Sequence, residues 1–373
     1  MRDFIKNILI EDFGANKCLT VFENSELLQY LDKKTEAVNR DSKARRAFGN
    51  IYAIYSILHF YVEDNFYSNP TKYKEFGGYE FGKLLDFCHT LYGGEKIQNH
   101  ALNNRLNFEF ENRKKIIENN KNKPLIVIKD SKYLVHVDYL YVDNNDISKT
   151  VIKIIETYIS LLKEKDTLLI EQLTKLENEN NLQLIRDELS TLLNEDSEAR
   201  VFEMFSYAIL KNYYQSQKVY FGFRKGKIKK EPLKLYKTGR TNANDGGIDF
   251  VMKPLGRFFQ VTEIGTYDKY FLDIDKVERY PITFVIKTKK TKKEVKKELA
   301  EYFEQKSGGV KAIAKKYKAA VEDVITMNEL EKMYKRLNAS NIKGLLRDIL
   351  NCYKIEMYAD AENEALETTA EQD

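Results

Sequence analysis

Residues 245–263 read DGGIDFVMKPLGRFFQVTE, and this stretch decides how the middle of the chain folds. The run from Ile248 to Met252 is apolar enough for a β-strand, and the two glycines before it permit a sharp entry. Pro254 and Gly256 then mark a turn, and a second strand-like run follows from Phe258 to Glu263. The pattern therefore predicts a β-hairpin.

Polar side chains share one face of the second predicted strand. Because side chains alternate along a strand, Phe259 and Val261 lie on one side, and Gln260 and Thr262 on the other. Asp249, in the first strand, is expected to share a pocket with Gln260 and Thr262. An aspartate after two glycines is, taken alone, more often a turn residue. Carboxylate oxygens are nevertheless the ligands that Mg²⁺ prefers, so Asp249 is the first candidate metal ligand.

The same stretch resembles the PD-(D/E)XK nuclease pattern, in which an acid on one strand is followed on the next by Glu or Gln, any residue, and Lys. Together with DKYFLDIDKVERYPITFVIKT at 268–288 and RRAFGNIYAIY at 45–55, it is similar to the ApaLI-like type II restriction endonucleases. The resemblance spans most of the chain, with motif-level specificity in the central segment. It implies an α/β fold with a PD-(D/E)XK-type nuclease core, a mixed central sheet flanked by helices.

This resemblance also implies an activity. It predicts Mg²⁺-dependent hydrolysis of both strands of double-stranded DNA at a short specific site, leaving 5′-phosphate ends. Asp249 then binds metal and Gln260 occupies the Glu/Gln position. Thr262 departs from the pattern, because a hydroxyl in the lysine position cannot supply an ammonium to the attacking water or the phosphate. A cytoplasmic bacterial enzyme is expected, with a cognate DNA methyltransferase and, for a palindromic target, a homodimer.

Three lysines are candidates to replace the missing ammonium. Lys253 lies in the predicted turn, Lys269 and Lys276 follow the second strand, and each has a flexible stem. Glu263 is a second candidate metal ligand or general base. Strand alternation turns it away from Gln260 unless a bulge intervenes.

A further acid comes from upstream of the hairpin. Apolar residues at helical spacing predict a helix over 196–214, which Asp196 or Ser197 can cap, and Glu203 lies among them. A buried carboxylate needs a cation or a donor, so Glu203 is a candidate metal ligand. The alternative is a half-exposed glutamate beside the core face.

Basic residues flank the predicted site. The net charge is only +4, but residues 211–240 contain ten basic residues and one acid, and residues 287–297 contain seven lysines and one acid. Phosphate contacts dominate nucleic-acid affinity, so these segments are expected to line a DNA-binding groove, with a hairpin turning near Gly226. The alternative is a solvated surface. The candidate DNA-contacting residues are Arg224, Lys225, Lys227, Arg240, Asn242, Asn244 and Arg257.

The expected organisation has four parts. Residues 1–194 form a mainly helical region with a small β-hairpin at 125–142, and residues 195–288 form the nuclease core. Residues 289–359 form a helical region that includes helices at 290–306 and 309–324. The last part, 360–373, is a tail with six acids and no base.

Composition excludes other classes. The chain has 373 residues, of which 43% are hydrophobic, and this argues against wholesale disorder. Its four histidines are scattered without metal-ligand spacing, which argues against a zinc or histidine-metal enzyme. The three cysteines show no pairing pattern, and we expect neither a signal peptide nor a membrane span. Two alternatives stay open: a structure-specific repair or junction nuclease of the same fold, and a degenerate protein that only binds DNA.

Overall fold

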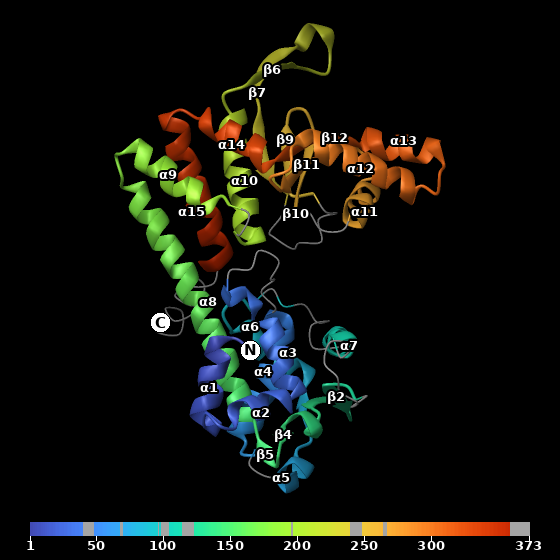
Figure 1. Ribbon diagram of the computed structural model, residues 1–373. Coiled ribbons are helices and arrows are strands. Elements are labelled where there is room, and N and C mark those ends of the chain that lie inside the picture. Colours follow the sequence, from blue (N-terminus) through green and yellow to red (C-terminus); the bar gives the residue numbers. More distant parts are fainter. Residues whose placement is uncertain are drawn as a thin grey trace, which may run out of the picture. The chain divides into compact units, whose positions relative to one another are not determined.

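The chain forms two compact units, Met1–Leu168 and Leu169–Asp373 (Figure 1). The computed structural model describes residues 1–39, 48–67, 70–95, 97, 104–113, 123–194, 197–238, 248–263 and 267–358. The division falls inside the long helix α8 (Ser148–Glu177), whereas the sequence suggested a boundary at residue 194. Within the described ranges, no helix has both the length and the apolar character needed to cross a bilayer.

The first unit is mainly helical. Its helices are α1 (Asp3–Phe13), α2 (Cys18–Glu23), α3 (Glu26–Lys34), α4 (Phe48–Glu63), α5 (Pro70–Glu75), α6 (Phe81–His89), α7 (Asn104–Arg113) and most of α8. Its short strands are β1 (Tyr79–Glu80), β2 (Ile126–Lys129), β3 (Lys132–Val135), β4 (Tyr141–Val142) and β5 (Asn145–Asp146). Helix α4 is the central element, because its apolar and aromatic side chains are buried almost all round, as in a core helix.

The predicted hairpin at 125–142 is present but shorter than expected. Strands β2 and β3 pair antiparallel, and β1 adds to the outer side of β3. Strand β3 ends at Val135 because the Nδ1 atom of His136 accepts the backbone N–H of Asp138 at 3.1 Å, which starts a 3₁₀ turn. The chain then continues into a separate two-stranded sheet formed by β4 and β5.

The second unit is built on a five-stranded mixed sheet with the order β12-β11-β10-β9-β8. Its strands are β8 (Lys234–Lys237), β9 (Phe250–Lys253), β10 (Arg257–Glu263), β11 (Ile282–Lys287) and β12 (Val321–Thr326). Strands β8, β9 and β10 run antiparallel in succession, whereas β10, β11 and β12 are parallel. The hairpin predicted from the central stretch is confirmed, and Gly256 takes a positive φ of 65° in its turn.

Helices cover both faces of this sheet. The face toward α10 packs one hydrophobic cluster, which includes Phe259 and Val261 of β10. The opposite face, toward α11, packs a second cluster that includes Tyr270 and Phe284. The helices of this unit are α9 (Leu182–Leu192), α10 (Ala199–Tyr214), α11 (Asp268–Lys276), α12 (Lys292–Lys306), α13 (Lys311–Ala320), α14 (Met327–Lys335), α15 (Ala339–Tyr358) and the last turns of α8.

One predicted helix is wrong over its last four residues. The helix expected over 309–324 ends at Ala320, and β12 follows directly. Consecutive side chains here are buried on opposite faces of the sheet, as a strand requires: Val324 packs on the α11 face and Ile325 on the α10 face. The sheet therefore extends past the core boundary expected at residue 288.

A basic hairpin projects from the second unit. It consists of β6 (Lys218–Phe221), a tip at 222–228, and β7 (Lys229–Pro232), and it forms its own two-stranded sheet. Figure 1 shows it extending away from the helices and the main sheet of its unit. The predicted hairpin around Gly226 is thus confirmed.

Candidate active site

A β-bulge at the start of β9 decides which way Asp249 points. Phe250 is paired with Phe259, yet the backbone N–H of Asp249 donates to the Phe259 carbonyl as well, at 3.0 Å. Two residues of one strand therefore face one residue of the next. The extra residue explains why Ile248 packs on the α11 face while Phe250 packs on the α10 face. Asp249 is thereby turned toward the α10 face.

The carboxylate of Asp249 is fixed against strand β10. Its Oδ2 atom accepts the backbone N–H of Val261 at 2.6 Å. A charged acceptor on a backbone donor is among the stronger hydrogen bonds of a protein. This bond holds an acid beside the carboxyl-terminal half of β10.

Glu263 and Lys287 form an ion pair at the same end of the sheet. The two residues are register partners in the parallel strands β10 and β11, two positions beyond the pair Val261 and Val285 on the α10 face. The Nζ atom of Lys287 lies 3.0 Å from Oε1 of Glu263. Lys287 also donates to the carbonyl of Ser197, just before α10. Its side chain is only 3% exposed, so a buried ammonium orients a half-buried carboxylate.

A second ion pair lies on the α10 face. Glu203, in α10, pairs with Lys237 at 3.2 Å, and both side chains are largely buried. Lys237 is the register partner of Phe250, so this pair sits beside the start of β9. The sequence argument that Glu203 needs a cation is confirmed, and the cation is Lys237.

Gln260 and Thr262 lie on the other face. Both are buried, and their register partners Phe284 and Ile286 belong to the α11-side cluster. Among the described residues, the Nε2 atom of Gln260 has one hydrogen-bond acceptor, the Val261 carbonyl at 3.4 Å, and its buried Oε1 has no hydrogen-bond partner. The structure therefore does not bring Gln260 to Asp249, and the shared pocket expected from simple alternation is not found.

The lysines proposed to replace Thr262 are now separated. Lys269, in α11, places Nζ 3.5 Å from the Thr262 hydroxyl, so it is the one that reaches the motif position. Lys276 pairs with Asp273 at 3.2 Å. Lys253 lies at the opposite end of β9 from Asp249, about 13 Å along the strand.

Burial shapes the α11 side of β10. Tyr270 is fully buried there, and burial raises its pKa while the neighbouring Thr262 hydroxyl offsets part of the rise. Asp273 is also buried; its Oδ1 atom accepts from Lys276, and its Oδ2 atom has no partner within the described ranges. This face is polar but enclosed, so it offers a phosphate little access.

The α10 face is suited to a hard cation. Within the described ranges, no group of three or more His, Cys, Asp or Glu side chains could hold a metal ion on its own. Mg²⁺ does not need such a cage, because it keeps several waters and usually takes one or two carboxylates together with substrate phosphate. Asp249 and Glu263 supply two carboxylates on one side of one strand end, with Val261 and Glu263 about 7 Å apart along β10.

The candidate DNA-contacting residues fall into three groups. Arg224, Lys225 and Lys227 are exposed at the tip of the basic hairpin. Arg257 binds Thr283 at 3.0 Å and Glu322 at 3.1 Å, at the opposite end of β10 from Glu263, so its guanidinium is committed to the protein. Arg240, Asn242 and Asn244 lie outside the described residues, as do Asp245, Asp196 and the acidic tail.

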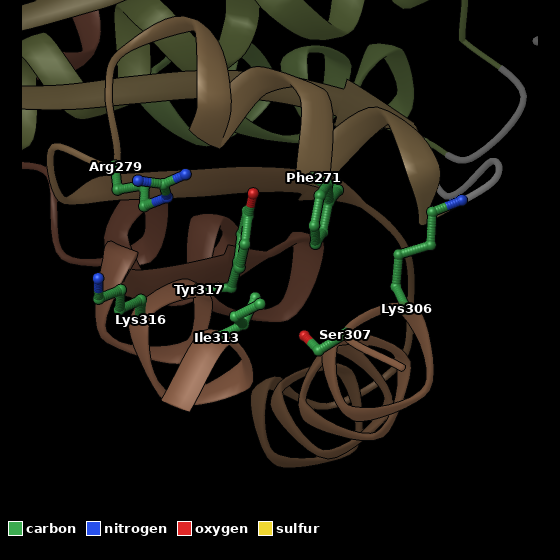
Figure 2. Close-up of a pocket in the computed structure, with 7 residues that line it drawn as sticks. All are labelled: Phe271, Arg279, Lys306, Ser307, Ile313, Lys316 and Tyr317. Atoms are coloured by element: carbon green, nitrogen blue, oxygen red, sulfur yellow. The ribbon is translucent and has the colours of Figure 1, made fainter. Parts of the chain in front are cut away.

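A cavity of about 370 Å³ lies apart from these residues, between α11, α12 and α13. Figure 2 shows the rings of Phe271 and Tyr317 side by side in it, and their centroids are 3.8 Å apart. None of Asp249, Gln260 or Glu263 lines it. Its lining residues are Phe271, Arg279, Lys306, Ser307, Ile313, Lys316 and Tyr317.

Sequence reasoning missed Lys287 as a site residue and counted it only as part of a basic run. The available signal was its position as the last residue of a strand whose side chains are buried throughout. A lysine there must carry its charge to an acid or a carbonyl. The parallel pairing of β10 with β11 was needed to identify Glu263 as that acid.

Comparison of the chain with protein-family models, with curated proteins and with solved structures finds no match.

Proposed function

We propose that this protein is a Mg²⁺-dependent endonuclease that hydrolyses double-stranded DNA at a short specific site. The observation that carries the proposal is that two carboxylates are held at positions two residues apart along β10: Asp249 accepts the Val261 N–H, and Glu263 pairs with Lys287. The sequence resemblance to restriction endonucleases supports the same reaction class. The basic hairpin of the same unit supports a polyanionic substrate.

The side chains of the candidate site would have different roles in the reaction. Asp249 and Glu263 would hold the ion, and Lys287 positions Glu263 while adding positive charge where a phosphate would enter. Bound Mg²⁺ polarises a phosphoryl oxygen and lowers the pKa of a coordinated water. Glu203, held by Lys237, adds negative charge on the same face and keeps α10 in place beside the sheet.

A digest of a sequenced plasmid tests the proposal. With Mg²⁺, the full-length protein is expected to give discrete fragments whose ends, once mapped, share one sequence and carry 5′-phosphates. EDTA is expected to abolish the products. Fragments without a common end sequence, or cleavage of branched DNA alone, would point to a structure-specific nuclease instead.

A second candidate function, DNA binding without cleavage, is favoured by one observation. Thr262 stands where the motif has lysine, and its hydroxyl faces α11 rather than Asp249. Absence of cleavage across many DNAs with Mg²⁺, Mn²⁺ and Co²⁺, together with retained DNA binding, would establish that alternative.

A further inference from the structure

The tip of the basic hairpin presents an aromatic side chain to solvent. Phe223 is 95% exposed, and Tyr220, on the adjoining strand, is 76% exposed. Burial of such a side chain stabilises a fold or a complex. Within the described residues, the one aromatic ring beside Phe223 is that of Phe221, with the two ring centroids 5.6 Å apart. An apolar side chain held out in this way is a candidate contact surface.

The hairpin is built to hold this side chain in place. Val219 packs at its base against the core cluster of the α10 face, and the N–H of Leu233 donates to the Gln217 carbonyl at 3.0 Å. At the tip, a Cβ on Gly222 would lie 2.5 Å from the Lys227 carbonyl, so only glycine permits the strand to turn there. The basic hairpin is thus anchored at its base by packing and held in a tight turn at its tip.

Positive charge surrounds the aromatic side chain. Residues 218–232 contain six basic residues and one acid. The basic residues of the tip, Arg224, Lys225 and Lys227, are exposed, and so are Lys229 and Lys230 in β7. The ammonium of Lys230 lies 6.0 Å from the ring of Tyr220. The positive charges are distributed along the basic hairpin, and this distribution suits a rod-shaped polyanion.

We propose that the β6–β7 hairpin enters a groove of double-stranded DNA and inserts Phe223 between adjacent base pairs, while the flanking lysines and Arg224 contact phosphates. A groove of the duplex admits a two-stranded β-ribbon, and apolar wedges between base steps unstack and kink DNA. The proposal rests on the proposed function in taking duplex DNA as the partner. It adds that this protein distorts its substrate.

An anionic membrane is the other partner that such a surface can fit. Two observations favour DNA. Only two apolar side chains, Phe223 and Ile228, are more than half exposed at the tip, which is little area for insertion into a bilayer. The basic residues also continue from the tip into β7, at Lys229 and Lys230, which as neighbours in a strand point to opposite faces.

A DNA topology assay tests the insertion of Phe223 and does not require knowledge of the recognition sequence. Relaxed plasmid is incubated with full-length protein, Ca²⁺ in place of Mg²⁺, and a topoisomerase, and the deproteinised DNA is resolved on a gel. The unsubstituted protein is expected to shift the topoisomer distribution. Phe223→Ala is expected to abolish the shift and to weaken binding roughly tenfold, the effect of losing one stacked aromatic side chain, without changing the salt dependence of binding.

Charge variants give the complementary result. Lys225→Gln with Lys227→Gln is expected to keep the topoisomer shift at saturating protein but to reduce the slope of log K against log salt by about 0.9 for each lost phosphate contact. Leu272→Ala, which removes an exposed apolar side chain from α11, and Lys332→Gln, in α14, are matched controls that should change neither quantity.

Separate outcomes overturn the two proposals. If Phe223→Ala unwinds DNA as much as the unsubstituted protein does, the proposed insertion of Phe223 is excluded. The insertion would also be excluded if Phe223→Ala lost binding to phosphatidylserine vesicles, or lost self-association in sedimentation, while its effect on DNA topology stayed the same as that of the unsubstituted protein. Unwinding that depends on Phe223, without any Mg²⁺-dependent cleavage, would support the insertion of Phe223 and exclude the proposed nuclease activity.

Discussion

The two faces of strand β10 carry different chemistry. On the α10 face, Asp249 accepts the Val261 N–H, and Glu263 pairs with Lys287 at the strand end. On the α11 face, Gln260 and Thr262 are buried beneath a helix, and the amide oxygen of Gln260 has no partner among the described residues. Gln260 and Thr262, the two motif positions on β10, therefore occupy the enclosed face, and the charged residues suited to a cation occupy the other.

A single inserted residue accounts for this difference. With strict alternation, Asp249 would share the face of its neighbour Gln260; the bulge opposite Phe259 turns it to the face of Phe250. The predictions below use variants on both faces.

The largest effect is expected for Asp249. Asp249→Asn keeps an oxygen that can accept the Val261 N–H but removes the charge, so the fold should survive and Mg²⁺-dependent plasmid cleavage should fall about a thousandfold, since a metal contributes several kcal/mol to such a transition state. Initial cleavage rates measure this, with thermal unfolding as the control. Cleavage within threefold of the unsubstituted protein would exclude Asp249 as a ligand.

Lys287 and Lys269 form a matched pair of lysines. Lys287→Met is expected to lower kcat about a hundredfold, the size of effect seen when one preorganised charged or polar group is lost, with little change in KM. It should also lower the melting temperature, because Glu263 loses its partner. Lys269→Met should change kcat less than about threefold, since in the part of the chain that the structure describes its ammonium has one hydrogen-bond partner, the Thr262 hydroxyl, which faces the enclosed side. The reverse ranking would place the chemistry on the α11 face.

Glu203 should have an intermediate effect. Glu203→Gln leaves Lys237 largely buried without its carboxylate, so we expect loss of stability of about 1–3 kcal/mol in urea unfolding. Cleavage at a temperature where the variant is folded should fall by less than for Asp249→Asn. A fall equal to that of Asp249→Asn, with stability unchanged, would instead make Glu203 a metal ligand.

The smallest effect is expected for Gln260. Gln260→Met has a similar volume and removes a buried amide oxygen that has no partner, so the free energy of unfolding should stay the same or rise by up to about 1 kcal/mol. Cleavage should be unchanged. Urea denaturation and plasmid cleavage of the same preparation check both parts, and a large loss of cleavage would restore Gln260 to the site.

Much of the second unit was readable from the sequence. The β9–β10 hairpin, the helix carrying Glu203, the buried strand β11 and the basic hairpin were all predicted, because each depends on local patterning and on glycine or proline at turns. Strand β12 was not, because the run VEDVIT continues a helical pattern and becomes a strand only through pairing with β11.

The composition of the site was less readable. Its candidate residues lay in the right segments, but their faces depend on a bulge that leaves no mark in the sequence beyond two glycines. The pairing of Glu263 with Lys287 depends on the parallel register of strands separated by helix α11. Local patterns do not encode such a register, because it is fixed by packing of the crossover helix on the sheet.

The Mg²⁺ dependence of plasmid cleavage in two variants tests the central claim most directly. Glu263→Gln should raise the Mg²⁺ concentration needed for half-maximal cleavage about tenfold or more, because it removes one of two carboxylate ligands, whereas Gln260→Met should leave that concentration unchanged. A raised Mg²⁺ requirement in Gln260→Met, with none in Glu263→Gln, would contradict a metal centre on the α10 face.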